Sequence, residues 1–513
     1  MHCRRYSRCA GSLPHRLRRL SRAVGLWPLL AFGLGACQFA PPLRVPAVRT
    51  APQYTAAPAP HRSDTGTDQR IAPQTFTYGA TLSRPWWQLF GSPRLDSTVA
   101  LALRRSPTVA AAQAQLRVAR ANVRISGAVL YPQVGVDLGA ARTKNSGANF
   151  GGHLPGSTFS LYTGSVAVSY YPDLFGINRL VYRGSEAQME AQDAVLAVAR
   201  LTLAGNVVDA AIGTAAATAR IRATRAVIVA QRRLLRLIEA QYRGGGVTYA
   251  DVLAQRAQLT ASESQLPPLQ QQLAVYRHLL AVLIGHSPSR ARGGSFTLRE
   301  FTLPRDIPVA LPSSLLRHRP DIRIAEAQMR YALTGVGIAK AQLFPLVTLS
   351  ASAGSTALTA GRLFSASSSV WSIGGALAQP IFEGGKLRAQ ERAAYATYDA
   401  ARATYRSTVL GAFQQVADAL RALEHDAAAA REQERLTRAL HAQIGLAEAG
   451  YRSGATDFSV VLLAEINYQN ARVASASITA ARLQDTTALF VALGGDGWPD
   501  RPGLAARAEA QRP

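Results

Sequence analysis

The sequence predicts a mainly helical protein with some β-structure, in which one unit of helices and a β-hairpin occurs twice. Three landmarks recur in the same order. YRGGGVTYADVLAQRAQL (242–259) returns as YRSGATDFSVVLLAEINY at 451, an offset of 209. RRSPTVAAAQAQL at 104 returns as RHRPDIRIAEAQM at 317, and YYPDLFGINRL at 170 returns as AQPIFEGGKLR near Pro380. Chance similarity of alanine-rich helices is the alternative, but turn and strand motifs recur as well. Because the repeats far exceed the 20–50 residues of solenoids, one duplicated unit is predicted.

The N-terminus has the pattern of a lipoprotein signal peptide. A basic segment (residues 16–22) precedes the apolar run AVGLWPLLAFGLGAC, which is too short to span a membrane as a helix. LGAC (34–37) resembles the bacterial lipobox, so we expect removal of residues 1–36 and lipid on Cys37. Gln38 follows the cysteine, and this resemblance implies sorting to the outer membrane. An ordinary signal peptide with a stray cysteine is the alternative.

The charge of the chain says little about nucleic acid. The formal net charge is +26, with 57 Lys and Arg against 31 Asp and Glu. Lysine occurs only at Lys144, Lys340 and Lys386, so the basic excess is almost entirely arginine, as in a GC-rich genome. No basic stripe interleaved with aromatic residues is present, and no nucleic-acid partner is expected.

Composition and pattern divide the chain into segments. The stretch after Cys37 is rich in Pro, Ala and Thr, as extended tethers are. We expect a lipid-anchored tether (37–80), a first repeat (81–285, with a hairpin at about 131–175), an equatorial linker (286–311), a second repeat (312–495, with a hairpin at about 344–382) and a polar C-terminal tail (496–513).

Four segments alternate with the period of two that is typical of half-exposed strands. In YPQVGVDLGA, Val134, Val136 and Leu138 fall on one face and Asp137 on the other. TGSVAVSYY completes the first hairpin, and FPLVTLSASAG with SVWSIGGALAQP forms the second. Loops are expected at 141–161 and 356–368. Each strand has about ten residues, the length that a tilted membrane strand needs. A soluble sheet packed on helices is the alternative.

Aromatic residues near the strand ends are placed as a membrane aromatic girdle would be. They are Tyr131, Tyr171, Phe344 and Trp371.

Long helices are expected after each hairpin. Two proline-free stretches of about 65 residues, near 177–243 and 385–452, would each extend about 100 Å. Such lengths favour a coiled coil or helical array. Shorter helices are expected at about 95–127, 248–284 and 457–493, with a kink at Pro267 and Pro268. Two short helices match one long helix in length, so we expect them to pair antiparallel with it.

Three blocks resemble the TolC-like outer-membrane efflux factors, particularly the NodT-type lipoprotein channels of RND efflux systems. They are LPRDIPVALPSSLLRHRPDIRIAEAQ (303–328), QPIFEGGKLR (379–388) and YRSGATDFSVVLLAE (451–465). The resemblance implies a β-barrel through the outer membrane, continuous with a periplasmic α-helical tunnel. It also implies a homotrimer, a periplasmic adaptor protein and an inner-membrane RND-type pump as partners. Four strands cannot close a barrel and open edges are not tolerated in lipid, so more than one chain is needed. Two chains would give eight strands and three would give twelve; the resemblance selects three.

The resemblance also assigns the repeated glycine turns to the periplasmic tips, where the adaptor docks. The expected adaptor-facing residues are Arg243, Gly244 and Gly245 in the first turn and Arg452 and Gly454 in the second. Two ordinary helix-capping turns are the alternative.

A periplasmic gate is implied at the same tips. Matching the family motif places a tie between subunits on Asp251 and Tyr451. The family's constricting aspartates fall on Val460 and Leu463, so we expect an apolar constriction that resists ions by dewetting. The alternative is that Asp251 only caps the helix that starts near Thr248.

No catalytic motif is found. The sequence has no hydrolase elbow, P-loop or zinc spacing, and His318 and His425 stand alone. Acidic residues along the helices are interpreted as solvated helix faces. We therefore expect a passive conduit for small molecules, with no enzymatic activity, cofactor or metal. A type I secretion conduit and a non-channel periplasmic structural or adaptor lipoprotein are the alternatives, although an adaptor would lack the four strands.

Overall fold

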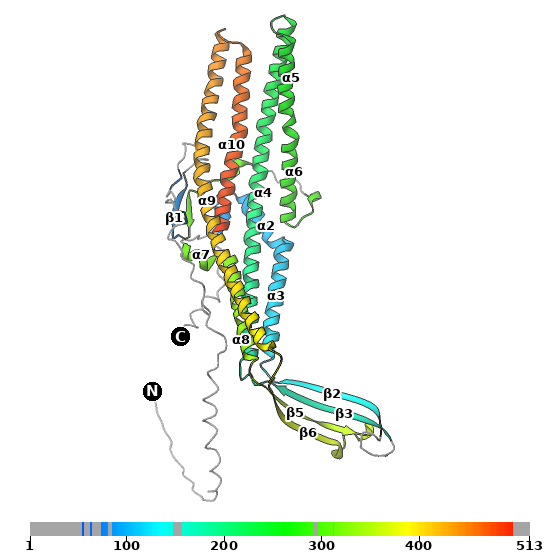
Figure 1. The fold of residues 1–513 in the computed structure, drawn as a ribbon. Coiled ribbons are helices and arrows are strands. Elements are labelled where there is room, and N and C mark those ends of the chain that lie inside the picture. Colours follow the sequence, from blue (N-terminus) through cyan, green and yellow to red (C-terminus); the bar gives the residue numbers. More distant parts are fainter. Residues whose placement is uncertain are drawn as a thin grey trace, which may run out of the picture. The chain divides into compact units, whose positions relative to one another are not determined.

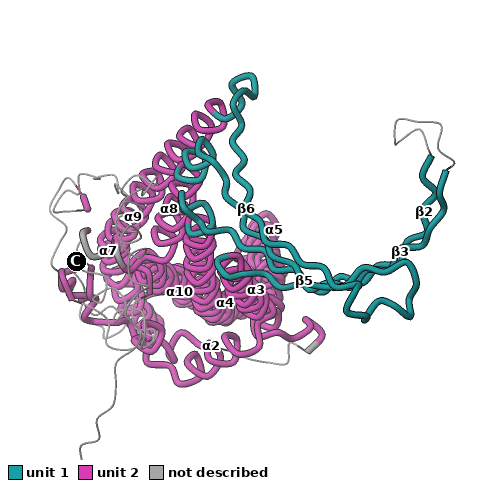
Figure 2. Tube along the Cα trace, turned by 90° about the horizontal axis from the view of Figure 1, so that it is seen from below, with its two compact units in different colours: residues 1–41, 130–179, 337–387 teal, residues 42–129, 180–336, 388–513 magenta. Residues whose placement is uncertain are grey.

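The computed structural model describes residues 54–55, 62–63, 73–80, 85–146, 156–290, 296–310 and 312–495. Cys37 and the predicted C-terminal tail lie outside these residues. The chain divides into two compact units (Figure 2). The described part of unit 1 comprises residues 130–146, 156–179 and 337–387 and holds a β-sheet. Unit 2 contains the other described residues and is mainly helical.

Unit 1 contains both predicted hairpins in one antiparallel sheet of order β2-β3-β5-β6. The strands are β2 (Gln133–Asn145), β3 (Ser157–Tyr170), β5 (Leu346–Ala357) and β6 (Ser369–Ala378). The expected first loop, 141–161, is too long, because the pairing of β2 with β3 continues to Asn145 opposite Ser157. Within the described chain β2 and β6 each pair on one side only, so the sheet has two open edges.

The register confirms the predicted alternation across all four strands. Val136 pairs with Val166, Val166 with Ala353, and Ala353 with Trp371, so these side chains share one face. Successive residues of a strand point to opposite faces, which places Asp137 on the other face. The first face is apolar and exposed, as a lipid-facing surface must be.

Three of the four proposed girdle residues lie at strand ends. Tyr131 precedes β2, Tyr171 follows β3, and Phe344 precedes β5. Phe344 stacks on Phe175 with ring centroids 5.1 Å apart, so it also has a protein partner. Trp371 lies within β6 and is 75% exposed. A membrane girdle formed by these residues stays a prediction.

Two long helices confirm the expected duplication. They are α4 (Ile177–Arg243) and α9 (Lys386–Arg452), with 67 residues each. The DLFG segment starts α4, because the Asp173 carboxylate accepts hydrogen bonds from the backbone N–H groups of Asn178 (3.0 Å) and Arg179 (2.8 Å). These N–H groups have no partner inside the helix, so Asp173 satisfies them.

The shorter helices are interrupted more often than expected. They are α2 (Pro93–Arg105), α3 (Pro107–Ala128), α5 (Tyr249–Ser264), α6 (Leu266–Leu283), α7 (Pro312–His318), α8 (Pro320–Ala341) and α10 (Phe458–Ala492). A single helix over 95–127 is wrong, because Pro107 holds Ser106 in an extended conformation. The second repeat breaks at the matching place, before Pro320. The predicted kink near Pro267 is confirmed as a break at Gln265.

Small residues allow the helices of unit 2 to pack closely. Val207, Ala211 and Ala215 of α4 are fully buried. A Cβ atom on Gly213 would lie 2.5 Å from the ring of Tyr276 on α6, so only glycine allows this approach. By length and composition α4 could cross a membrane, but 56% of its most apolar window is buried inside the chain. It is therefore described as a core helix.

A small parallel sheet includes the last residues of the predicted tether, so the predicted boundary at residue 80 is too late. Strand β1 (Thr75–Tyr78) pairs with β4 (Asp306–Val309), so residues up to 80 are not all extended tether. Burial of Phe76 and Ile307 in the core of unit 2 explains the pairing. Tyr54 also belongs to this region, because its hydroxyl donates to the Ala310 carbonyl at 2.7 Å.

Candidate functional site: the helical tips and their supports

The two helical hairpins, α4–α5 and α9–α10, end at the same end of unit 2 (Figure 1). A buried apolar seam joins them. Val227, Ala230 and Leu234 of α4 pack with Leu462 and Ile466 of α10. The seam therefore joins the two hairpins that carry the predicted tip turns.

The first tip is a Schellman turn. The Gly245 N–H donates to the Tyr242 carbonyl (3.0 Å), and the Gly246 N–H donates to the Gln241 carbonyl (2.8 Å). This pair of bonds satisfies carbonyls that the end of α4 would leave unpaired. It requires a left-handed residue at Gly245, whose φ is +77°.

The second tip has the same hydrogen bonds, 209 residues later. The Gly454 N–H donates to the Tyr451 carbonyl (3.1 Å), and the Ala455 N–H donates to the Gly450 carbonyl (2.8 Å). Gly454 has a φ of +76°. The repeat first seen in the sequence is therefore a repeat of backbone geometry.

An aromatic pair closes each turn, and this pair was not predicted from the sequence. The rings of Tyr242 and Tyr249 are 5.6 Å apart in the first tip. The rings of Tyr451 and Phe458 are 5.1 Å apart in the second. The signal was present in the sequence, because an aromatic residue recurs seven positions after each turn tyrosine. Each pair joins the end of a long helix to the start of the returning helix.

The residues expected to face an adaptor are all exposed at the turns. They are Arg243, Gly244, Gly245, Arg452 and Gly454. The Arg452 guanidinium donates to the carbonyl of Glu448 (3.2 Å), within its own helix. Exposure is what a docking surface requires, and the docking itself stays a prediction.

Asp251 caps the helix that follows the first tip. Its Oδ2 accepts hydrogen bonds from the Thr248 N–H (2.8 Å) and the Thr248 hydroxyl (2.7 Å), and the Asp251 N–H donates back to that hydroxyl. This is a capping box. The hydrogen bonds from the Thr248 side chain and backbone lower the pKa of Asp251. Among the described residues, no hydrogen bond joins Asp251 to Tyr451, and a tie between subunits stays a prediction.

The second tip lacks this cap. Asp457 precedes α10 without a side-chain capping bond, and Val460 takes the place that Asp251 has in the first repeat. Val460 is 39% exposed and Leu463 is 50% exposed. They are three residues apart on one face of α10, which leaves an apolar stripe near the tip.

Leu463 also lines a groove of about 440 Å³ between α4, α5 and α10. Side-chain amides dominate its walls, among them Gln258 and Asn467. Gln231 and Gln255 are buried at the groove and hydrogen-bonded to each other. None of the residues that line the groove is charged, so its walls are neutral.

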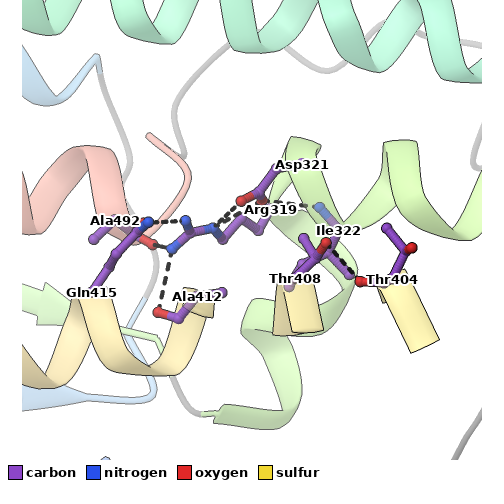
Figure 3. Close-up of polar contacts among 8 residues, drawn as sticks. All are labelled: Arg319, Asp321, Ile322, Thr404, Thr408, Ala412, Gln415 and Ala492. Atoms are coloured by element: carbon purple, nitrogen blue, oxygen red, sulfur yellow. Dashed lines mark hydrogen bonds and ion pairs between the residues drawn. The ribbon is translucent and has the colours of Figure 1, made fainter. Parts of the chain in front are cut away.

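Arg319 ties together three helical segments, and this role explains the RHRPDI block. The side chain is 6% exposed and lies where α7 meets α8 (Figure 3). Its guanidinium donates to the Ala492 carbonyl (2.6 Å), the Ala412 carbonyl (3.4 Å), the Gln415 side chain and the Asp321 carboxylate (2.9 Å). It therefore joins the start of α8 to the middle of α9 and the end of α10. In the sequence this block carries the family resemblance, but its spacing does not predict contacts with α9 and α10.

Three half-buried aspartates, Asp209, Asp426 and Asp485, show that not all acidic residues along the helices lie on solvated faces. Burial, and then the charge of Asp485, raise the pKa of Asp209 to about 7. Burial, followed by the hydrogen bond and charge of Asp485, raises the pKa of Asp426 to about 7, against the opposing charge of Arg482. Arg482 is 2% exposed. These residues come from α4, α9 and α10, so only the fold brings them together.

Among the described residues, no group of three or more His, Cys, Asp and Glu side chains could hold a metal ion. The tip turns, the seam and Arg319 hold the helices of unit 2 together. An exposed apolar sheet with open edges and two coiled-coil hairpins define the protomer of a membrane channel.

The chain belongs to the outer membrane efflux protein family, whose model matches residues 98–286 and 311–495. These two matched segments are the two structural repeats. The chain is 32% identical over 427 residues to the pyoverdine export outer membrane protein OpmQ of Pseudomonas aeruginosa, covering 82% of this chain and 89% of that protein.

Solved structures agree with this assignment. The outer-membrane channel OprN superposes with a TM-score of 0.78 at 28% identity, over 90% of this chain and all of that chain. The CmeC channel of Campylobacter jejuni gives a TM-score of 0.79 at 21% identity, over 93% of this chain and 98% of that chain, and shares the fold. The protein is thus an outer-membrane efflux channel of the TolC-like fold. Its family is one of channels and not of enzymes.

Proposed function

We propose that three copies of this chain close one twelve-stranded barrel and conduct small molecules from an inner-membrane RND-type pump to the cell exterior. The observation that carries the proposal is the four-stranded sheet with one exposed apolar face and two open edges. Such edges need partners in lipid, and neighbouring copies supply them. Efflux channels of this kind are trimeric and work with adaptor and pump partners.

The two glycine turns are the proposed docking points for the periplasmic adaptor. Both are exposed and share one backbone geometry, so a trimer would present six similar turns. A repeated adaptor motif could recognise both kinds of turn. Arg243 and Arg452 carry a positive charge at the same place in each turn, and they favour an acidic or carbonyl-rich partner surface.

The proposed entrance is closed by apolar side chains together with a tie between subunits. Val460 and Leu463 are exposed on α10, at the positions where the family resemblance places constricting acids. A pore narrowed by such residues excludes ions by dewetting. The pair Asp251 and Tyr451 would hold neighbouring subunits in the closed state.

Anchoring by lipid on Cys37 is also proposed. The related nodulation protein T of Rhizobium leguminosarum bv. trifolii, at 26% identity, supports the NodT-type resemblance.

Family membership favours the efflux channel over a type I secretion conduit. A periplasmic adaptor does not fit, because the chain carries four strands of membrane-spanning character.

The entrance is tested by placing a charge at its proposed constriction. Val460→Asp should introduce cation selectivity and block by divalent cations in planar bilayers, because three carboxylates would then line the pore. Ala455→Asp adds the same charge in the exposed turn of the same tip and should change selectivity far less. Equal effects of the two variants would contradict the proposed position of Val460.

A further inference from the structure

The four strands of unit 1 carry three charged side chains, and these are divided between the two faces. They are Asp137, Arg142 and Lys144, all on β2. Alternation along the strand places Arg142 and Lys144 in the same row as Val136, on the lipid-facing side. Asp137 stands on the opposite face, where it is the only charged side chain among the described strand residues.

The surroundings of Asp137 are small and neutral. Asp137 pairs with Ser165 of β3, and Ser165 pairs with Gly354 of β5. The neighbouring positions of β2 on the same face are Gly135 and Gly139. Within the described strands, no long side chain on this face covers the carboxylate, which is exposed. Its field therefore reaches the space in front of the sheet.

We infer that Asp137 is a specificity-determining residue of the conduit, which favours cations and cationic small molecules inside the barrel. The inference rests on the proposed function, because only the trimer turns this face into a lumen and brings three copies of Asp137 to one level. Val460 and Leu463 put apolar side chains at the proposed constriction, so Asp137 adds a fixed negative charge at a separate level, inside the barrel. The effect is electrostatic, so it is strongest at low salt and is screened beyond about 8 Å at physiological ionic strength.

The local potential can be measured with a cysteine at the paired position. In Ser165→Cys, the rates of reaction with cationic and anionic methanethiosulfonates report the potential beside Asp137. Wild-type protein gives the background, because its cysteines are Cys3, Cys9 and Cys37, all at or before the predicted lipid site. Paired residues have Cβ atoms about 5 Å apart. A unit charge near that distance in water changes the ratio of the two rates by about tenfold.

We expect the cation-to-anion rate ratio at Ser165→Cys to fall about tenfold when Asp137→Asn is added, and to be retained with Asp137→Glu. The difference should shrink at about 1 M salt, where the screening length is about 3 Å. An unchanged ratio in Asp137→Asn, with normal reactivity of the cysteine, would overturn the inference and leave the barrel intact.

A neighbouring position separates this failure from failure of the barrel itself. Val136→Cys places the thiol on the lipid-facing row, where charged reagents in water should not reach it. Reaction at Val136→Cys as fast as at Ser165→Cys would contradict the assignment of the two faces, and with it the proposed channel. If Val136→Cys is protected and the cation-to-anion rate ratio at Ser165→Cys depends on Asp137, both the proposed channel and the role of Asp137 are supported.

Discussion

Asp251 Oδ2 lies 2.7 Å from the Thr248 hydroxyl oxygen and 2.8 Å from the Thr248 backbone nitrogen, so a residue expected to tie subunits together also caps its own helix. The two roles are compatible, because the hydrogen bonds of this carboxylate within the described chain use Oδ2. Oδ1 can accept a hydrogen bond from the Tyr451 hydroxyl of a neighbouring subunit. A capped and rigid Asp251 would hold that acceptor in place.

Substitutions can separate the tie between subunits from the helix cap made by Asp251. Asp251→Ala and Tyr451→Phe should each raise single-channel conductance in planar bilayers, because each removes the same tie. The double variant should add little beyond either single variant.

Thr248→Val is the matched control, since it removes the capping hydroxyl and keeps both members of the tie. Its conductance should stay near that of the wild type. If Thr248→Val opens the channel as much as Asp251→Ala, the cap explains the effect and the tie does not exist.

Arg319 should be among the most costly positions to change. Arg319→Ala leaves the Ala492 carbonyl and the Gln415 side chain without their buried donor. We expect a loss of about 3–5 kcal/mol in the free energy of unfolding, as for other broken buried charge networks. Arg319→Lys should rescue little, because one ammonium cannot reach acceptors on three segments. Denaturant unfolding followed by circular dichroism measures the loss.

The control for Arg319 is Arg323, in the first turn of α8. Its side chain is 40% exposed and lies 4.0 Å from Asp193. Exposed ion pairs contribute about 0–1 kcal/mol, so Arg323→Ala should be mild. Comparable losses for the two variants would show that the hydrogen bonds of Arg319 contribute no more to stability than an exposed ion pair.

Stability should depend on pH through the half-buried carboxylates of Asp209 and Asp426. The folded-state pKa values of Asp209 and Asp426, each about 7, lie above the usual value for aspartate. The folded state therefore holds protons that the unfolded chain releases, and this contribution to stability is lost as pH rises from about 4 through about 7. The unfolding temperature should be higher near pH 5 than near pH 8, by a few degrees.

Asp485→Asn tests this assignment, because Asp485 contributes to both raised pKa values. The variant should flatten the pH dependence and stabilise the protein most near pH 8. Burial lowers the pKa of Arg482 only to about 10, so this residue stays charged at both pH values and the change isolates one carboxylate. A pH profile identical to that of the wild type would refute the proposed coupling.

Lipid attachment is tested at Cys37. Cys37→Ser should abolish labelling of the mature chain by palmitate, because LGAC offers one cysteine to the lipidation enzymes. The trimer should survive, since the barrel alone can hold the protein in the membrane. Persistent labelling would show that the lipobox assignment is wrong.

Much of this architecture could be predicted from the sequence because it follows from local pattern. Long proline-free helical stretches predicted both 67-residue helices, and alternation of apolar and polar residues predicted both hairpins. The break at Ser106 was missed, although Pro107 carried the signal. Strand β1 could not be predicted, because Phe76 is held by burial against distant residues.

The candidate site also combines features that the sequence predicts with features that it does not. The tip turns were visible as repeated glycine motifs, and their backbone geometry follows from Gly245 and Gly454. The cluster of Asp209, Asp426 and Asp485 draws on three helices, and no spacing in the sequence brings these residues together. Long-range packing alone raises the pKa values of Asp209 and Asp426.

The central claim is that three chains close one barrel, and the mass of the intact assembly in detergent tests it most directly. Native mass spectrometry of the purified protein should give three times the mass of the mature chain, which derives from a precursor of 54.7 kDa. Trimer closure pairs every open edge of β2 with β6 of a neighbour. A monomer under conditions that preserve membrane assemblies would contradict the account.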